Sequence, residues 1–320
     1  MKIKLSLSVI ALSLFIWLTV TPGCNKSNNS GINSQTSTIS DILKVGTNAT
    51  YFYYAMTRTG MDSVLNGTGP FTVFVPTDSA FEASGITISH LIGMTDSALK
   101  RIILYETFGG SLPSSAISGQ NRSTIMANGE TVYLTNNSNG FYFNGIPIEQ
   151  ADITAKNGLI QAISNSVPFP PKGNLLQLVQ TDTAYMFLNV VVNRASPSGQ
   201  PGVTGISLLS GPGPNSLFAP NNYAFQTSGY PDTNAINAIS PDSLWNLLTY
   251  HLVPARMFTS DISSGMRVVT LRDTSTILFS SSGPNRLVIG NSNDVPANVL
   301  QSNIMATNGV LYKIDGVLTP

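Results

Sequence analysis

The side chains that could carry out chemistry are few in this chain and lie far apart. It contains two histidines, His90 and His251, and a single cysteine, Cys24, and none of them has neighbours at the spacing of a metal site. Serines are abundant, but no Gly-x-Ser-x-Gly turn presents one as a nucleophile, and no glycine-rich phosphate loop occurs. We therefore predict that the protein is not an enzyme and has no cofactor or metal site. A hydrolase that uses scattered serine and aspartate residues is the alternative from the enzyme class.

The charge of the chain excludes one class of partner. The formal net charge is zero, only 10% of the residues are charged, and no basic run occurs. A nucleic-acid-binding protein needs a positive surface to meet the phosphates, so we expect no nucleic-acid partner.

The N-terminus has the pattern of a secretory leader. Lys2 and Lys4 precede an apolar stretch over residues 5–20, which is shorter than the ~20 residues that a membrane-spanning helix needs. We assign residues 1–23 to a signal peptide. Residues 24–38 are rich in Asn, Ser, Gly and Thr, and we assign them to a flexible tether.

Cys24 directly follows Gly23 at the end of this leader, and the junction resembles the lipobox of bacterial lipoproteins. Thr21 and Pro22 depart from the residues that this pattern prefers. The resemblance implies that Cys24 is the lipid attachment site and anchors the chain to a membrane of the bacterial cell envelope, the outer membrane, on its periplasmic or surface-exposed face. The alternative is an incidental cysteine in a plain secretory signal.

Two sequence blocks occur twice, in the same order, and the elements they form must position any site. Residues 72–81 (TVFVPTDSAF) return as residues 216–225 (SLFAPNNYAF), and residues 150–160 return as residues 301–311. Two matches at nearly equal offset indicate a tandem duplication of one domain. We place domain 1 at residues 39–170 and domain 2 at residues 174–320, joined by a short Pro-rich linker.

Within each half, helical patterns come first and strand patterns follow. In the first half Ser40 is the predicted N-cap of the opening helix, and Pro76 ends a strong strand pattern. In the second half one helix is predicted over residues 174–193, and an irregular insertion is predicted over residues 199–214. Helices that lead each repeat and strands that close it predict an α+β fold.

These blocks resemble the signature of the fasciclin (FAS1) domain family. Its first block, Thr-Val-Phe-Ala-Pro-Thr-Asn-x-Ala-Phe, matches residues 72–81 and 216–225, and its closing strand, which begins Asn-Gly, matches the segments from Asn157 and Asn308. The resemblance covers nearly all of residues 39–320. It implies two tandem FAS1-like domains, each a wedge or sandwich of β-sheet with packed helices.

The same family has a helix that ends in Tyr-His. Tyr250 and His251 match it, whereas Glu106 replaces the histidine in the first repeat. In some animal relatives this segment is implicated in contacts with adhesion receptors, so the resemblance makes Tyr250 and His251 interaction candidates. The alternative is structural, with Tyr250 packed in the core and His251 bonded to a nearby loop.

Other differences between the copies bear on where a ligand would bind. Asp78 and Asn222 occupy the same place, and either side chain can accept a backbone N–H, so we predict that they cap a helix or hold a turn. The aromatic cluster at residues 51–54 (YFYY) could stack on sugar rings, but its helical spacing favours a cluster that is half core and half surface. Since the shared residues keep the fold, we expect the ligand-binding surface to lie where the copies differ.

Together these features predict a lipid-anchored protein of the cell envelope. We hypothesise that its two fasciclin-like domains mediate adhesion by binding surface proteins or extracellular polysaccharide. Two tandem copies would raise the overall affinity if both met one ligand. The alternative is an accessory binding component of an outer-membrane glycan-uptake system.

Overall fold

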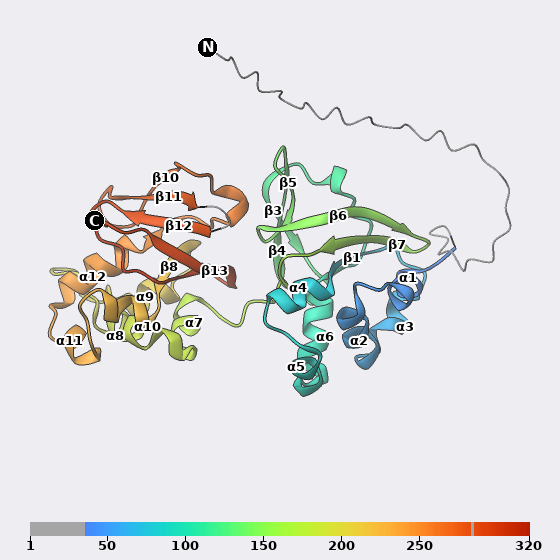
Figure 1. The fold of residues 1–320 in the computed structure, drawn as a ribbon, viewed down its shortest axis with the longest axis horizontal. Helices are drawn as coiled ribbons and strands as arrows, with labels where there is room; N and C mark the ends of the chain where they lie inside the picture. Colours follow the sequence, from blue (N-terminus) through green and yellow to red (C-terminus); the bar gives the residue numbers. More distant parts are fainter. Residues whose placement is uncertain (1–35, 283–284) are drawn as a thin grey trace, which may run out of the picture. The chain divides into compact units, whose positions relative to one another are not determined.

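The structure, a computed structural model, describes residues 36–282 and 285–320 (Figure 1). The predicted signal peptide, Cys24 and almost all of the predicted tether lie outside the described residues. Within the described ranges no single helix has the length and apolar character to cross a membrane. One pair, Leu175–Thr181 with Thr183–Arg194, meets that criterion only when joined, and it is bent by 97°.

The first repeat begins with helices and ends with strands. Its helices are α1 (Ile39–Val45), α2 (Thr50–Arg58), α3 (Met61–Leu65), α4 (Asp78–Ala83), α5 (Ile88–Gly93), α6 (Asp96–Tyr105) and the 3₁₀ helix η1 (Ser114–Ala116). Its strands are β1 (Phe71–Pro76), β2 (Thr107–Phe108), β3 (Gly119–Ile125), β4 (Thr131–Asn137), β5 (Gly140–Phe143), β6 (Ile146–Ala155) and β7 (Gly158–Ile163). These strands form one sheet in the order β2-β1-β7-β6-β5-β4-β3.

The second repeat follows the same plan. Its helices are α7 (Leu175–Thr181), η2 (Thr183–Tyr185), α8 (Met186–Arg194), α9 (Gly205–Ser210), α10 (Asn222–Thr227), α11 (Thr233–Asn237), α12 (Pro241–Tyr250) and η3 (Thr259–Asp261). Its strands are β8 (Asn215–Pro220), β9 (Leu252–Val253), β10 (Arg267–Val269), β11 (Thr276–Ser282), β12 (Asn285–Gly290), β13 (Ala297–Ala306) and β14 (Gly309–Ile314), in the order β10-β11-β12-β13-β14-β8-β9. In each repeat the helices gather on one side of the sheet (Figure 1). The predicted tandem α+β architecture is therefore confirmed.

The two duplicated blocks form neighbouring strands within each sheet. β1 pairs in parallel with β7, which places Val73 opposite Ile160, and β8 pairs in the same way with β14, which places Leu217 opposite Leu311. Every residue of β1 and β8 after the first is buried. A strand that is covered on both faces needs a mainly apolar run, and the one hydroxyl residue in each buried run, Thr72 or Ser216, donates to a backbone carbonyl. The two blocks of each repeat therefore meet as adjacent strands inside one sheet.

Each central strand separates two layers of core. Val73 and Val75 belong to the core beneath the helices, whereas Phe74 between them belongs to the core against β4 and β5. Leu217 and Phe218 divide in the same way in the second repeat. This alternation follows from the two-residue period of a strand, so one short segment anchors both layers.

An asparagine ties the ends of each repeat together. Its side-chain oxygen accepts the first N–H of the leading helix, and its amide donates to two carbonyls near the turn before the central strand. In the first repeat Asn157 makes these bonds to Ile39, Leu65 and Gly67, at 2.9, 2.8 and 2.7 Å. In the second repeat Asn308 makes them to Leu175, Leu209 and Gly211, at 2.9, 2.9 and 2.6 Å.

The glycine after each of these asparagines is required by a close approach of two strands. A Cβ at Gly158, whose φ is +153°, would lie 1.9 Å from the carbonyl oxygen of Phe71. A Cβ at Gly309 would lie 2.1 Å from the carbonyl oxygen of Asn215. Since both obstacles are backbone atoms, only glycine fits at the start of the closing strand.

Three predicted local features differ from the structure. Thr38, not Ser40, caps α1, because the Asp41 carboxylate reaches back to the Thr38 N–H in a capping box. The single helix predicted over residues 174–193 is broken at Asp182, which has ψ of 117° and caps η2 with its carboxylate. The insertion over residues 199–214 is not wholly irregular, because Thr204 caps helix α9 within it.

Candidate functional site

Asp78 and Asn222 hold the fold. The Asp78 carboxylate accepts hydrogen bonds from Thr50 Oγ1 at 2.7 Å and from the Tyr51 N–H at 2.9 Å, so it stabilises the start of α2. Asn222 Oδ1 accepts the Phe187 N–H at 3.2 Å, at the start of α8. Each side chain accepts a backbone N–H, as predicted, but that N–H belongs to an earlier helix in the chain, which local sequence patterns do not reveal. The helices that follow are capped by Thr77 and Asn221 instead.

Tyr250 lies inside the second repeat. Its side chain is 0% exposed, and its hydroxyl donates to the Thr276 carbonyl and accepts the Asn291 N–H, at 2.8 and 2.9 Å. His251 is also 0% exposed. The structure thus places both interaction candidates where neither meets a partner without local opening of the fold.

His251 is a neutral, fully bonded histidine. Its Nδ1 donates to the Leu247 carbonyl at 2.8 Å, and its Nε2 accepts the Leu318 N–H at 2.9 Å. Burial lowers the pKa of His251 to about 4, because the charged ring would lose its hydration. Both ring nitrogens are occupied by backbone groups, so His251 cannot act as a base for a serine.

Glu106 replaces this histidine in the first repeat and is a buried group without a partner. Its side chain is 0% exposed, and neither carboxyl oxygen has a hydrogen-bond partner in the described part of the chain. Burial raises the pKa of Glu106 well above its usual range. The backbone N–H that matches Leu318 in position after the closing strand is that of Val167, and it donates to the Ser84 hydroxyl. The copies thus differ here inside the protein and not on a binding surface.

Two other sequence candidates have structural explanations. In the aromatic cluster Phe52 is buried, the three tyrosines are partly buried, and Tyr51 packs edge-on against Phe81 at 5.6 Å. The cluster is therefore half core and half surface, as its helical spacing predicts. His90 is exposed and forms a capping box with Thr87 at the start of α5. Among the described residues, no group of three or more His, Cys, Asp or Glu side chains could hold a metal ion.

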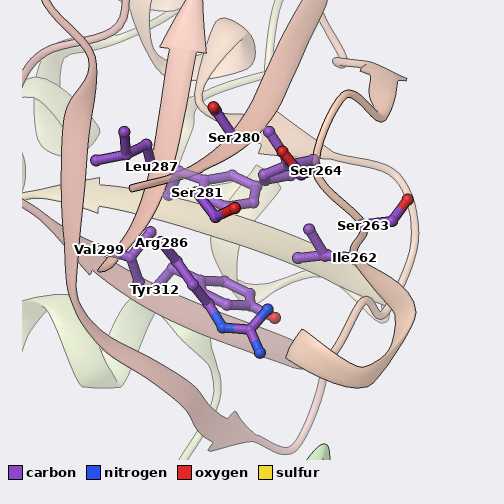
Figure 2. A pocket seen from close by; sticks show the side chains of 11 residues that line it. Ile262, Ser263, Ser264, Ser280, Ser281, Arg286, Leu287, Val299 and Tyr312 are labelled. Atoms are coloured by element: carbon purple, nitrogen blue, oxygen red, sulfur yellow. The ribbon is translucent and has the colours of Figure 1, made fainter. Parts of the chain in front are cut away.

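A pocket of about 250 Å³ opens in the sheet half of the second repeat (Figure 2). Strands β8, β11, β12, β13 and β14 contribute to it, together with the loop that follows η3. Its lining residues are Phe218, Ile262, Ser263, Ser264, Phe279, Ser280, Ser281, Arg286, Leu287, Val299 and Tyr312. Its volume is below the ~300–1,000 Å³ of sites for drug-sized ligands, so it suits a single small group.

The base of the pocket is aromatic and rigid. Phe218 stacks on Tyr312 with ring centroids 4.9 Å apart and contacts Phe279 at 5.5 Å. The Tyr312 hydroxyl donates to the Met257 carbonyl at 2.8 Å, and burial raises the pKa of Tyr312 well above its usual range. The hydroxyl is therefore a neutral, occupied group that fixes the ring in place.

The mouth of the pocket combines one cation with serine hydroxyls. Arg286 is exposed, and Nη1 donates to the Thr259 carbonyl at 3.2 Å, one of five donors that a guanidinium carries. Both ion pairs of the described residues lie in the first repeat, so Arg286 has no carboxylate partner among them. Figure 2 shows Ser281 and Arg286 on neighbouring strands, with Ser264 and Ile262 on the loop opposite. The mouth therefore presents an unpaired positive charge next to hydroxyl groups.

The first repeat fills the equivalent space with a side chain. Arg286 pairs across the strands with Ser281, and the corresponding pair in the first repeat is Phe141 with Asn136. Phe141 is buried, and its ring packs edge-on against Phe74 at 6.4 Å. The pocket is thus a feature in which the second copy departs from the first.

The backbone around this pair is the same in both copies. Ser114 and Thr259 each open a 3₁₀ helix, and each carbonyl accepts one side-chain donor from the cross-strand pair. Asn136 is that donor in the first repeat, at 2.8 Å, and Arg286 is the donor in the second. In the first repeat the amide makes the bond and the phenyl ring fills the space. In the second repeat the guanidinium makes it from the rim, and the small Ser281 leaves the space open.

Phe218 belongs to a duplicated block that the sequence analysis assigned to the fold, but none of the pocket residues was predicted from the sequence to bind a ligand. The signal that would have found them is the exchange of Phe141 for Arg286 at the same register of a duplicated hairpin. That exchange becomes visible only after the strands are paired, because the hairpin segments of the two copies share little sequence.

Comparisons with known proteins agree on one family. A family model described as the fasciclin domain matches residues 47–167 and 204–320. Transforming growth factor-beta-induced protein ig-h3 of Sus scrofa is 25% identical over 278 residues, which cover 86% of this chain and 38% of the pig protein. Stabilin-1 of Homo sapiens is 25% identical over 287 residues, which cover 83% of this chain and 10% of the human protein. The chain thus spans well under half of the length of these relatives.

Two further comparisons cover a bacterial protein and a solved structure. Protein sll1483 of Synechocystis sp. (strain ATCC 27184 / PCC 6803 / Kazusa) is 30% identical over 118 residues, which cover 36% of this chain and 60% of that protein. The solved structure is a FAS1 domain pair from the insect cell adhesion molecule fasciclin I. It has a TM-score of 0.41 and 17% sequence identity, and the match covers 84% of this chain and 96% of that chain.

Proposed function

Because the chain belongs to the fasciclin domain family, we propose that it is a cell-envelope lipoprotein that mediates adhesion by binding surface proteins or extracellular polysaccharide. In homologous proteins fasciclin domains serve in cell adhesion and binding. Cys24 would hold the lipid anchor, and residues 24–38 would let the two domains reach away from the membrane.

The observation that carries this proposal is the open pocket of the second repeat. It is concave, has a rigid apolar base and bears a small number of polar groups at its mouth, which is the composition of a ligand site. The residues that could otherwise support a reaction are occupied, since both nitrogens of His251 bond the backbone and His90 caps its own helix. These features favour recognition over catalysis.

The proposal is tested with the full chain purified in a non-ionic detergent. The chain is applied to a glycan array and used to capture proteins from the surface fraction of the cells that produce it, with a detergent-only sample as the blank. We expect saturable binding to at least one glycan class or one surface protein. Binding to neither would refute the proposed function. Turnover of an ester or glycoside panel that a single substitution abolishes would show an enzyme instead.

The lipid anchor has a separate test. We expect the natural chain to stay with the membrane fraction after a high-salt wash, and the Cys24→Ser variant to appear in the soluble fraction, because its acyl chains would be missing. A Cys24→Ser chain that remains in the washed membranes would show that the anchor assignment is wrong.

A further inference from the structure

We infer that the pocket of the second repeat binds one acidic sugar residue, a uronate, of an extracellular polysaccharide, with its carboxylate on Arg286. This inference rests on the proposed function and names the ligand class of the same site. Three features of the pocket carry it: the unpaired cation, the hydroxyl groups around the mouth and the size of the apolar hollow.

The charge at the mouth selects an anion. Arg286 is the one charged residue among the described residues that line the pocket, and within the described part of the chain its guanidinium makes one hydrogen bond, to the Thr259 carbonyl. The remaining N–H donors form a planar fork that matches the two oxygens of a carboxylate. A neutral ligand would leave this cation without a counter-charge.

The residues beside Arg286 favour an anionic ligand that also carries hydroxyl groups. Ser264 and Ser281 both lie at the mouth, and each hydroxyl can both donate and accept a hydrogen bond. Ile262, Leu287 and Val299 are only partly buried and give the hollow an apolar wall. A pyranose ring presents hydroxyls at its edge and C–H groups on its face, so it matches both surfaces. A purely aliphatic carboxylate would use the wall but not the serines.

The volume limits the ligand to one residue of a chain. A hollow of about 250 Å³ lies below the range of pockets that enclose drug-sized molecules, so it holds a single ring. The mouth is open to solvent at Ser263, Ser264 and Ser281, which are exposed. The rest of a polysaccharide can therefore extend from the bound residue into solvent.

The first repeat provides the natural control for this site. Phe141 occupies there the position of Arg286 and packs against Phe74, which removes both the hollow and the cation. The Arg286→Phe variant transfers this closed state to the second repeat. The Arg286→Gln variant keeps a polar side chain that can still bond a carbonyl, but it removes the charge. The Arg267→Gln variant removes an exposed charge from β10 of the same sheet, outside the pocket, and serves as the matched control.

The test is isothermal titration calorimetry of the full chain in non-ionic detergent with trigalacturonate and with the same trisaccharide after carboxyl reduction. We expect trigalacturonate to bind about tenfold or more tightly than the reduced form, because a hydrogen bond to a charged group is stronger than a neutral one. Arg286→Gln should abolish this difference, Arg286→Phe should abolish the binding of both sugars, and Arg267→Gln should change neither. Thermal melts of all variants show that they are folded.

Several results would overturn the inference. Equal binding of the two trisaccharides would exclude carboxylate recognition, and unchanged binding by Arg286→Gln would place the site elsewhere. A tripeptide with a C-terminal leucine that binds with the same dependence on Arg286, when the sugars do not, would assign the pocket to protein ends instead. If the chain binds none of these probes but does bind a glycan on the array or capture a protein from the surface fraction, the inference is rejected and the proposed function stands.

Discussion

Acidification should destabilise the second repeat through His251. The ring is neutral in the folded protein, with Nδ1–H directed at the Leu247 carbonyl and Nε2 accepting the Leu318 N–H. A proton on Nε2 would face that N–H donor and remove the bond. Because the pKa of His251 falls from 6.5 in the unfolded chain to about 4 in the fold, the unfolded state binds more protons in this interval. The stabilisation is therefore complete above pH 6.5 and is lost as the pH falls toward 4.

The magnitude follows from the pKa difference. The pKa of His251 falls from 6.5 to about 4, and each pKa unit is worth about 1.36 kcal/mol. The unfolding free energy should therefore fall by roughly 3 kcal/mol between pH 7.5 and pH 4. This is a large share of the ~5–15 kcal/mol that stabilises a typical domain. The second repeat should therefore unfold at a clearly lower urea concentration at pH 4.5 than at pH 7.5.

The assay uses the tryptophan that the second repeat contains. Trp245 packs against the helix-side core, and the other tryptophan, Trp17, lies in the predicted leader. A Trp17→Phe background makes fluorescence report on the second repeat, and urea titrations at several pH values give its unfolding free energy. The His251→Gln variant lacks the titrating ring, and His90→Gln, in which an exposed histidine is replaced, is the control.

The decisive quantity is the difference in unfolding free energy between the natural chain and His251→Gln at each pH. We expect this difference to shrink by roughly 3 kcal/mol from pH 7.5 to pH 4, while His90→Gln follows the natural chain. If the difference is the same at both pH values, or if His90→Gln shows the same change, the assignment of acid sensitivity to His251 is refuted.

Three further predictions concern residues on which the repeats depend. Glu106→Met should stabilise the first repeat by about 1–3 kcal/mol, because it removes a buried carboxyl without partners. Because the pKa of Glu106 is raised in the fold, the destabilisation by its carboxyl grows as the pH rises above the ordinary value of 4.5, so hydrogen exchange should show a larger stabilisation by Glu106→Met at pH 8 than at pH 5. Asn308→Ala should lower the unfolding free energy from the Trp245 urea titration by about 3 kcal/mol, because the three hydrogen bonds of this buried side chain are lost. A decrease of under about 1 kcal/mol would contradict this role. Gly158→Ala should lower the melting temperature strongly and Gly93→Ala, where a Cβ meets no atom within 4 Å, should not, as differential scanning calorimetry would show.

Much of the fold follows from local patterns in the chain. The β-prone run that Pro76 ends, the Asn-Gly pairs and the repeated order of the blocks predict two α+β domains, and the structure confirms this. The helix start and the helix break were predicted wrongly because several neighbouring polar residues could each cap a helix there. Thr38 replaces Ser40 as the cap because Asp41 completes its capping box, and Asp182 breaks a helix that apolar periodicity alone would continue.

The copies differ at several positions, but their sequences do not show which differences lie inside the fold. Glu106 and His251 occupy equivalent positions in the two repeats, and both are buried. From sequence alone, a carboxylate and an imidazole would ordinarily indicate an exposed residue or a functional site. Burial is a property of the whole domain, because it depends on which helices and strands cover a residue from elsewhere in the chain.

Local sequence determines the duplication, the order of helices and strands, and the Asn-Gly pairs that begin the last strand of each repeat. It can do so because backbone geometry and apolar periodicity act over a few neighbouring residues. Local sequence does not determine the pocket. Whether the space beside the central strand is filled by Phe141 or left open below Arg286 depends on which residue faces Asn136 or Ser281 across a hairpin, and on which carbonyl the pair can reach. These contacts join β-strands and a 3₁₀ helix that are separated in the chain, so only tertiary packing could create the candidate site.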